Sequence, residues 1–233
     1  MKGSHPPLAF LFDMDGVLIN SMPLHMQAWE DYLLPFGMRV DDLESRMHGR
    51  RNPELVRDLF GEGLPEDVVL EHGAAKERLF RKLLAEDIER FRIPGLVSFI
   101  RRHADVPKAV GSNAERANVD FILDRLALRT YFQAIVDGSE VAKPKPFPDI
   151  YLLAAERLHI EPSRCIVFED SPAGAEAARA AKMRVVAVET IPTEFTGVDL
   201  VIRDFEDSKL EPWLLSQTSS EIETPPVSTG VEH

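Results

Sequence analysis

The stretch LAFLFDMDGVLINS, residues 8–21, places two acidic side chains directly after a run of apolar ones. Leu8–Phe12 are all apolar, and Asp13 and Asp15 follow at once. A short apolar run bounded by Pro and Gly is typical of a strand that is buried on both faces. Carboxylates a few ångströms apart resist joint ionisation, so this pair predicts either a nearby positive charge or open solvent.

The later part of the chain alternates between apolar runs and helical patterns. Runs typical of strands occur at residues 108–111, 134–138, 165–170, 184–189 and 200–202. Helical spacing of apolar residues occurs at residues 97–103, 114–126, 148–158 and 172–182. Strands that alternate with helices predict parallel pairing, with helices on both faces of the sheet. The expected fold class is therefore α/β, with a Rossmann-like, doubly wound parallel sheet.

A long helical region interrupts this alternation. Apolar residues recur every three or four positions over residues 22–36, and helical patterns follow at 52–60 and 66–91. No convincing strand pattern occurs in this region. We therefore expect an inserted helical cap domain that lies over the end of the first strand. The predicted division is a core of residues 7–20 and 93–214 and a cap of residues 21–92.

Composition and charge narrow the class of protein. The chain has 233 residues, of which 44% are hydrophobic, and a formal net charge of −12. Such a charge disfavours nucleic acid or an anionic membrane as a partner, and no apolar segment approaches a membrane span. We expect a monomer that acts on a small molecule.

The single cysteine and the two ends of the chain allow further predictions about cellular compartment and disorder. Cys165 cannot form an internal disulfide, which favours a reducing cytoplasm, and it is expected to be a small core residue. The first apolar run is too short for a secretory signal. Residues 215–233 are rich in Ser, Thr, Pro and Glu, which predicts a disordered tail.

Polar side chains follow four of the predicted strands. Ligands of open parallel sheets bind outside the carboxyl ends of the strands, so these side chains are expected to converge. They are Asp13 and Asp15, Ser112 and Asn113, Asp137 with Lys143 and Lys145 beyond it, and Glu169 and Asp170.

Acids, a hydroxyl and a lysine at one sheet edge favour phosphoryl chemistry. Mg²⁺ prefers oxygen ligands and is usually held by one or two carboxylates together with substrate phosphate. A hydroxyl, backbone N–H groups and an ammonium can hold phosphoryl oxygens. One carboxylate can attack phosphorus, and a second can protonate the leaving alkoxide and later deprotonate water.

Four motifs of the chain resemble those of the haloacid dehalogenase superfamily, and they occur in that family's order. They are FDMDGVLINS at 12–21, VGSNA at 110–114, KPFPDIY at 145–151 and FEDSPAG at 168–174. Together they span the whole predicted core. The resemblance implies a Mg²⁺-dependent phosphatase that hydrolyses small phosphomonoesters, such as sugar or polyol phosphates, through an aspartyl-phosphate intermediate.

The resemblance also implies a role for each motif residue. Asp13 would be the nucleophile, and Asp15 the general acid and base. Ser112 and Lys145 would hold the phosphoryl group. Lys145 is favoured over Lys143 because its spacing to the prolines and Asp149 matches the motif. The implied metal-binding set is Asp13, Asp15 (through its backbone carbonyl), Asp170 and, close behind it, Glu169.

Several of these residues have plainer readings. Ser112 could cap the helix that follows it, a role compatible with anion binding. Ser171 precedes Pro172, so helix capping is its expected role. Asp137 is expected to be a turn acid before a glycine. Gly16 is expected to let the chain turn sharply away from the acids.

Candidate substrate-binding residues also occur outside the four motifs. Asn113 follows Ser112 in the second motif, and the stretch HGRRN at 48–52 is basic within an acidic chain. This stretch could be a solvated helix end or could contact the substrate. Resemblance to the β-phosphoglucomutase-like branch places cap residues against the substrate and favours the second reading. The candidates are Asn113, His25, His48, Gly49, Arg51 and Asn52, whereas Met26 and Trp29 are expected to form the cap's own core.

The expected reaction type follows from how this sequence differs from two kinds of family member, those that release halide and the β-phosphoglucomutases. Members that release halide lack the second acid, so Asp15 favours phosphate chemistry. A β-phosphoglucomutase carries a Lys-Gly pair and an Arg on the cap, and a Ser-Lys pair behind the serine motif, for a second phosphate. Here His48 and Asn52 stand near the cap positions, and Glu115 stands where the second Lys belongs. Arg50, Arg51 or Arg116 could compensate. We therefore favour a phosphatase over a mutase.

Two other classes of protein remain as alternatives. Receiver domains of two-component signalling also combine an acid pair, a phosphorylated Asp, a hydroxyl and a Lys on a doubly wound sheet. Their acid pair follows the first strand and their phosphorylated Asp the third, an order that differs from this chain. The other alternative is a binding protein without activity, and the full set of acids argues against it.

Overall fold

The computed structural model describes residues 8–47 and 50–219 and contains a six-stranded parallel sheet. The strands are β1 (Ala9–Phe12), β2 (Lys108–Gly111), β3 (Ala134–Val136), β4 (Cys165–Glu169), β5 (Arg184–Val188) and β6 (Leu200–Ile202). Their order is β3-β2-β1-β4-β5-β6, and every neighbouring pair is parallel. This is the order of a doubly wound, Rossmann-like sheet, so the predicted fold class is confirmed.

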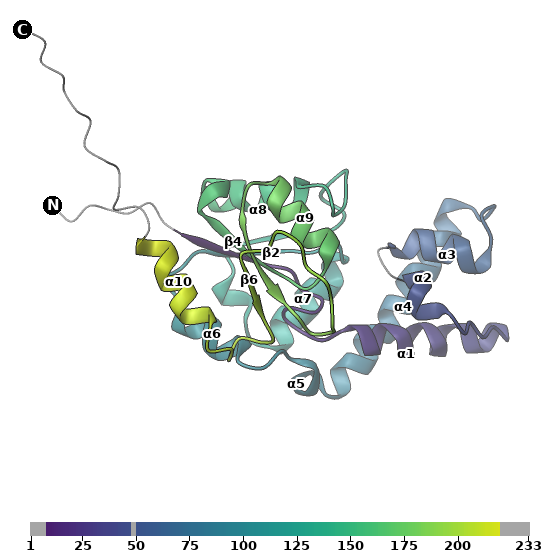
Figure 1. Cartoon of the computed structure of the whole chain (residues 1–233). Coiled ribbons are helices and arrows are strands. Elements are labelled where there is room, and N and C mark those ends of the chain that lie inside the picture. Colours follow the sequence, from purple (N-terminus) through teal and green to yellow (C-terminus); the bar gives the residue numbers. More distant parts are fainter. Residues whose placement is uncertain (1–7, 48–49, 220–233) are drawn as a thin grey trace, which may run out of the picture.

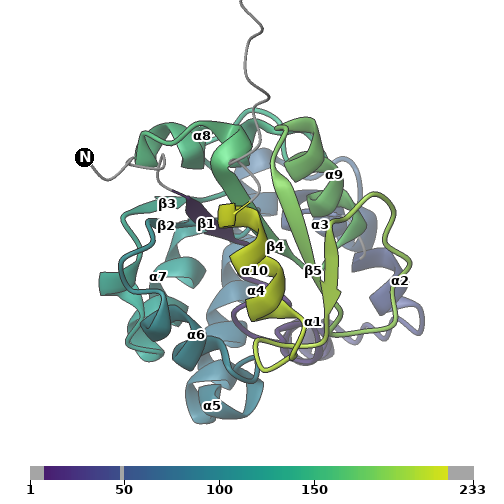
Figure 2. The same cartoon turned by 60° about the vertical axis from the view of Figure 1, so that its left-hand side comes forward.

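Helices cover both faces of the sheet (Figures 1 and 2). One face carries α8 (Asp149–Leu158) and α9 (Pro172–Ala180), and the other carries α6 (Leu96–Arg102), α7 (Arg116–Arg125) and α10 (Leu210–Ser219). Along β1, Ala9 and Leu11 pack with the first pair, whereas Phe10 and Phe12 pack with the second set. Burial on both faces explains why this strand is apolar at every position. Short 3-10 turns lie at η2 (Arg129–Tyr131) and η3 (Pro162–Arg164).

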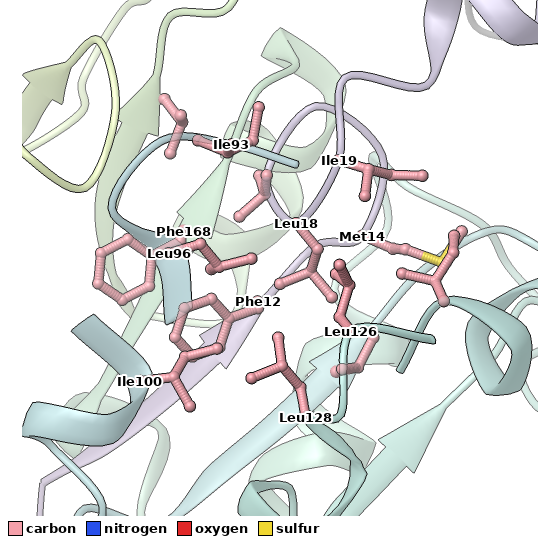
Figure 3. Close-up of a cluster of buried hydrophobic side chains, with 14 of the residues drawn as sticks. Phe12, Met14, Leu18, Ile19, Ile93, Leu96, Ile100, Leu126, Leu128 and Phe168 are labelled. Carbon is pink, nitrogen blue, oxygen red and sulfur yellow. The ribbon is translucent and has the colours of Figure 1, made fainter. Parts of the chain in front are cut away.

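The apolar side chains of the loop after β1 are as buried as those of the strand itself. Met14, Leu18 and Ile19 have no exposed surface. Figure 3 shows these side chains in the same apolar cluster as Phe12 and Ile93. Because this loop carries the acid pair, its anchoring fixes the backbone of both acids.

Cys165 also lies in the core, as predicted. Its side chain is fully buried, and burial raises the pKa of the thiol to about 12. The thiol is therefore protonated and inert at neutral pH.

The predicted cap region forms helices beyond the carboxyl ends of the strands (Figure 1). They are α1 (Met22–Leu33), η1 (Leu34–Phe36), α2 (Leu43–Met47), α3 (Asn52–Phe60), α4 (Glu66–Glu86) and α5 (Ile88–Phe91). A small core of their own contains Trp29 and, partly buried, Met26, as expected for these two residues. We refer to residues 21–92 as the helical insert.

The two connections between the helical insert and the sheet lie side by side. The backbone N of Asn20 donates to the carbonyl of Phe91 at 2.7 Å, and that of Ile93 donates to Leu18 at 3.1 Å. Ile19 and Arg92 form an isolated antiparallel bridge. The insert is therefore attached through two paired segments of chain.

Two predicted boundaries were wrong. The helix expected over residues 66–91 ends at Glu86, because the side chain of Asp87 accepts a hydrogen bond from the Arg90 amide and starts α5. At the other end, α10 continues to Ser219, five residues into the segment expected to be disordered. Leu210 and Leu214 attach this helix to the core. Residues 220–233 lie outside the described residues.

In the described part of the chain, no helix combines the length and the apolar character that crossing a membrane requires.

Candidate active site

The carboxyl ends of β1 and β4 and the loop after β3 bring three charged motif residues together. The Nζ atom of Lys145 lies 2.8 Å from Asp13 Oδ1 and 2.5 Å from Glu169 Oε1. The competing residue, Lys143, instead holds its Nζ over the ring of Phe147, 4.9 Å from the centroid. Lys145 is therefore the lysine that neutralises the acids, as its spacing in the sequence predicted.

Burial and crowding govern the charges in this cluster. Burial raises the pKa of Asp13 to about 7, against the opposing effect of Lys145, and neighbouring Glu169 and Asp15 raise it further. Burial also raises the pKa of Asp170 well above its usual range, with Glu169 and Asp13 adding to the effect. Burial alone would lower the pKa of Lys145, but the adjacent carboxylates outweigh it and raise that pKa. Lys145 is therefore charged. Because the pKa values of Asp13 and Asp170 remain raised beside it, one lysine does not supply enough positive charge to keep all the acids ionised.

Glu169 is enclosed by hydrogen-bond donors. It has no exposed surface, and its Oε1 accepts from Lys145 and from the hydroxyl of Tyr151, at 2.5 and 2.8 Å. Its Oε2 accepts from the backbone N and the Oγ of Ser171, at 3.0 and 2.9 Å. Both oxygens are therefore committed to the protein, and Glu169 holds Lys145 in line with Asp13.

Two glycines make room for the acids. Gly16 has φ +72°, and a Cβ there would lie 1.8 Å from Asp170 Oδ2. A Cβ at Gly174 would lie 1.7 Å from Glu169 Oε1. The sharp turn expected at Gly16 is confirmed, and the close approach of its backbone to Asp170 is a second reason for glycine.

The donor set fits a hard divalent cation. One carboxylate oxygen each of Asp13, Glu169 and Asp170 lies within 4.8 Å of the others. Oxygen donors in this number suit Mg²⁺, whose charge would allow the crowded acids to ionise together. Because Glu169 is already hydrogen-bonded through both oxygens, Asp13 and Asp170 are the better placed direct ligands.

Ser112 and Asn113 lie at the end of β2, next to this cluster. Ser112 is 1% exposed, and its Oγ accepts from the backbone N of Ala114 at 3.1 Å. The following helix begins only at Arg116, without a side-chain cap, so a capping role for Ser112 is wrong. Asn113 Oδ1 accepts from the backbone N of Lys145 at 3.4 Å and thereby ties the two motifs together.

The plainer expectations for two other residues are confirmed. Ser171 caps α9, because its Oγ accepts from the backbone N of Gly174 at 3.0 Å, and Pro172 begins the helix. Asp137 is a turn acid whose Oδ1 accepts from the backbone N and the Oγ of Ser139, at 2.9 and 2.5 Å.

The helical insert reaches the acid pair through His25. Its Nε2 lies 3.6 Å from Asp15 Oδ1, and its ring stacks on Phe80 with 3.8 Å between centroids. On the other side of the ring, Nδ1 lies 3.1 Å from Lys76 Nζ. Burial would raise the pKa of Asp15, but the imidazole outweighs it, and the pKa is lowered. The two acids of the first motif therefore have different neighbours and opposite shifts.

Only part of the basic stretch 48–52 can be placed. His48 and Gly49 lie outside the described residues. Arg50 pairs with Asp58 at 3.1 Å on the exposed side of the insert, as a solvated helix end would.

The last two residues of this stretch are more enclosed. Asn52 begins α3, and its Nδ2 donates to Glu77 Oε1 at 2.6 Å. Two guanidinium nitrogens of Arg51, Nε and Nη2, are buried and have no hydrogen-bond partner among the described residues. An unpaired buried donor is costly, so these atoms are suited to a polar ligand.

Sequence reasoning missed two charged residues beside the site, Lys76 and Glu77. Both are buried, at 2% and 4% exposure. They lie within the apolar face of α4, between the buried Gly73 and the buried Phe80 and Leu84. Charges at apolar positions of a helical repeat are a signal that could have identified them.

Comparisons with known proteins agree with this geometry. A model of the haloacid dehalogenase-like hydrolases matches residues 7–182. The chain is 33% identical to fructose-1-phosphate phosphatase YqaB of Escherichia coli over 181 residues, 76% of this chain and 94% of that protein. It is 30% identical to a beta-phosphoglucomutase of Bacillus subtilis, across 87% of this chain and 92% of that one.

A solved structure shares the whole architecture. CbbY from Rhodobacter sphaeroides, in complex with xylulose-(1,5)bisphosphate, superposes with a TM-score of 0.77 at 27% identity, covering 86% of this chain and 96% of that one. The strand order and this match exclude a receiver domain, the alternative raised by the sequence. Fold, clustered motifs and relatives lead to one conclusion: the chain belongs to the haloacid dehalogenase-like hydrolases.

Proposed function

We propose that this enzyme is a Mg²⁺-dependent phosphatase of small phosphomonoesters of the sugar or polyol phosphate class. The observation that carries the proposal is the pairing of Asp13 with Lys145, with a second acid, Asp15, on the same loop. A nucleophile, a cation for phosphoryl oxygens and a separate acid are the groups that ester cleavage requires. The relatives support the substrate class, since one is a fructose-1-phosphate phosphatase and another a phosphorylated carbohydrates phosphatase.

Each group of the cluster then has a chemical task. Asp13 attacks phosphorus, and Lys145 and Ser112 hold the phosphoryl oxygens. In the free protein the lowered pKa keeps Asp15 ionised, so Asp15 takes up a proton when the negatively charged phosphoryl group of the substrate binds beside it. As the ester bond breaks, Asp15 gives that proton to the leaving alkoxide. Asp15 next takes a proton from water, the resulting hydroxide attacks the aspartyl phosphate, and inorganic phosphate and the Asp13 carboxylate are released.

Asp13, Asp170 and the backbone carbonyl of Asp15 would hold the metal ion. When bound, Mg²⁺ offsets the repulsion between the acids and the phosphoryl group. Glu169 supports the set by fixing Lys145 and Ser171.

We assign substrate recognition to the helical insert, acting as a cap on a monomeric core of residues 7–20 and 93–214. His25 lies against Asp15, and Arg51 offers two buried donors that no described residue of the protein binds. Asn113 borders the phosphoryl site from the core side. Asn52, whose amide is bound to Glu77, is better explained as a support for the cap than as a direct ligand.

One contact favours hydrolysis over phosphosugar transfer. A mutase needs a second cationic site for the distal phosphate of a bisphosphate. Arg81 of the insert donates to Glu115, the residue that stands where a lysine would serve that purpose. The pair is neutral as a unit, so it offers a second phosphate little attraction.

A phosphate-release screen tests the proposal. Sugar, polyol, nucleotide and glycolytic phosphates are incubated with the enzyme in Mg²⁺ and, in parallel, in EDTA. The expected result is release from sugar or polyol monophosphates that stops in EDTA and returns with Mg²⁺. Turnover that survives complete metal removal would overturn the metal assignment, and preference for nucleotides would overturn the substrate class.

A further inference from the structure

Glu77 is a buried carboxylate for which the reaction has no direct use. It lies in the middle of α4 with 4% of its surface exposed, next to Lys76 at 2%. Charged side chains are almost never this buried unless they are paired and hydrogen-bonded, because desolvation is costly. The partners of Glu77 therefore indicate what it does.

Glu77 joins the helical insert to the core. Its Oε1 accepts from Lys76 Nζ at 2.5 Å, and its Oε2 accepts from Asn118 Nδ2 at 2.7 Å. Asn118 belongs to α7 of the core and is 1% exposed. Its Oδ1 accepts from Arg81 at 2.5 Å, so both ends of the amide are used and its donor is directed at Glu77.

From Glu77 the contacts continue to the acid pair. Lys76 Nζ lies 3.1 Å from His25 Nδ1, and His25 Nε2 lies 3.6 Å from Asp15 Oδ1. The path thus starts on a core helix, crosses α4 and α1 of the insert, and returns to the loop after β1.

We propose that the hydrogen bond between Glu77 and Asn118 positions His25 beside Asp15. Asn118 fixes Glu77, Glu77 fixes Lys76, and Lys76 fixes the imidazole. The inference rests on the proposed function, in which Asp15 serves the leaving group, and adds two positioning residues that touch no substrate.

The variant Asn118→Asp tests this contact, because it sets a second carboxylate against Glu77. With an aryl phosphate, kcat is expected to fall at least tenfold while KM changes less than threefold, since Ser112 and Lys145 still hold the phosphoryl group. Asn118→Ala, which removes the contact without adding charge, is measured in parallel and should show a smaller fall of the same kind.

The control is Arg125→Ala on the same core helix. Arg125 donates to the backbone carbonyl of Ala85 at 3.2 Å, so this change removes another hydrogen bond between α7 and α4 without touching Glu77. Its kcat is expected to stay within twofold of the wild-type value.

A double variant provides the decisive rescue. Glu77→Gln combined with Asn118→Asp exchanges donor and acceptor, so the new amide can donate to the new carboxylate, which still accepts from Arg81. The expected kcat lies within threefold of wild type. A double variant no better than Asn118→Asp alone, or single variants at Asn118 with kcat within twofold of wild type, would overturn the proposal.

Hydrogen exchange separates this inference from the proposed function. If the wild-type chain releases phosphate from none of the esters, the proposed function is refuted. The positioning role of Glu77 and Asn118 is then tested by hydrogen exchange, which requires no activity. Faster exchange in α1 around His25 is then expected for Asn118→Asp and normal exchange for the double variant. Unchanged exchange in both would contradict the role.

Discussion

Asp13 and Asp15 are the same chemical group two residues apart, and their neighbours give them different properties. Lys145 contacts Asp13, whose pKa is nevertheless raised to about 7 by burial and crowding. His25 lies beside Asp15, whose pKa is lowered despite burial. The sequence predicted the pair and its lysine because they belong to short motifs. It could not predict His25, which reaches Asp15 from a separate helix, on residue spacing alone.

The first prediction at the residue scale concerns the nucleophile. Asp13→Asn keeps the shape of the side chain but removes the attacking charge, so kcat should fall on the order of a thousandfold or more. The measurement is steady-state hydrolysis of an aryl phosphate, with circular dichroism to confirm folding. Near-normal turnover in Asp13→Asn together with a dead Asp15→Asn would mean that the two roles are reversed.

The second prediction concerns Gly16, with Gly37 as its matched control. Both have φ near +70°, but a Cβ at Gly16 would meet Asp170 Oδ2 at 1.8 Å, whereas one at Gly37 meets nothing within 4 Å. Alanine at either site should cost about 1–2 kcal/mol of backbone strain, measured by urea unfolding. Only Gly16→Ala should also lower kcat, by at least tenfold. Equal activities would show that the Asp170 contact is unimportant.

At the scale of elements, strands were easier to predict than helix ends. The runs 108–111 and 200–202 match β2 and β6 residue for residue, because a short run of mainly apolar residues between polar ones marks both ends of a strand. The helix expected over 66–91 was too long, since Asp87 ends it with a local cap that periodicity does not reveal. The contact of Glu77 with Asn118 spans 41 residues and follows from packing of two elements, not from the pattern of either.

The third prediction concerns the pH dependence of α4 stability. Burial alone would raise the pKa of Glu77, but Lys76, His25 and the Asn52 hydrogen bond lower it from 4.5 to about 2. The resulting stabilisation is complete above the unfolded-state pKa and is lost as the pH falls toward the folded-state value. Between pH 7 and pH 3.5 it should shrink by roughly 1 kcal/mol.

Urea unfolding of the wild type and of Glu77→Gln at both pH values measures this effect. The difference in unfolding free energy between the two proteins should be smaller at pH 3.5. A difference that does not change with pH would show that Glu77 is not charged in the folded protein.

At the scale of the whole molecule, the proposed function assigns the chemistry to the core and substrate recognition to the helical insert. Three of the candidate cations for a second phosphate are paired within the protein: Arg81 with Glu115, Arg50 with Asp58 and Arg116 with Asp120. Arg51 differs from these three, because two of its buried donors have no partner within residues 8–47 and 50–219. These pairings could not be inferred from the sequence, which offered Arg50, Arg51 and Arg116 as equal candidates.

The fourth prediction separates hydrolysis from transfer. β-Glucose 1-phosphate with a glucose bisphosphate primer should give mainly inorganic phosphate, if this sugar is accepted. A coupled assay that follows glucose 6-phosphate and free phosphate in one reaction makes the comparison. Much faster formation of glucose 6-phosphate, abolished by Arg51→Ala, would identify a mutase whose second site uses that arginine.

The paired connections at Asn20 and Phe91 have a consequence for how such enzymes diversify. The segment that leaves the sheet at Asn20 is hydrogen-bonded to the segment that returns at Phe91. The two ends of the insert are therefore as close together as the two ends of a hairpin loop. A segment of any length whose ends lie this close can be exchanged there while β1 and α6 keep their places. An exchanged segment would keep the strand-end residues Asp13, Ser112, Lys145 and Asp170 in the sheet, but it would have to supply its own counterpart of His25 beside Asp15.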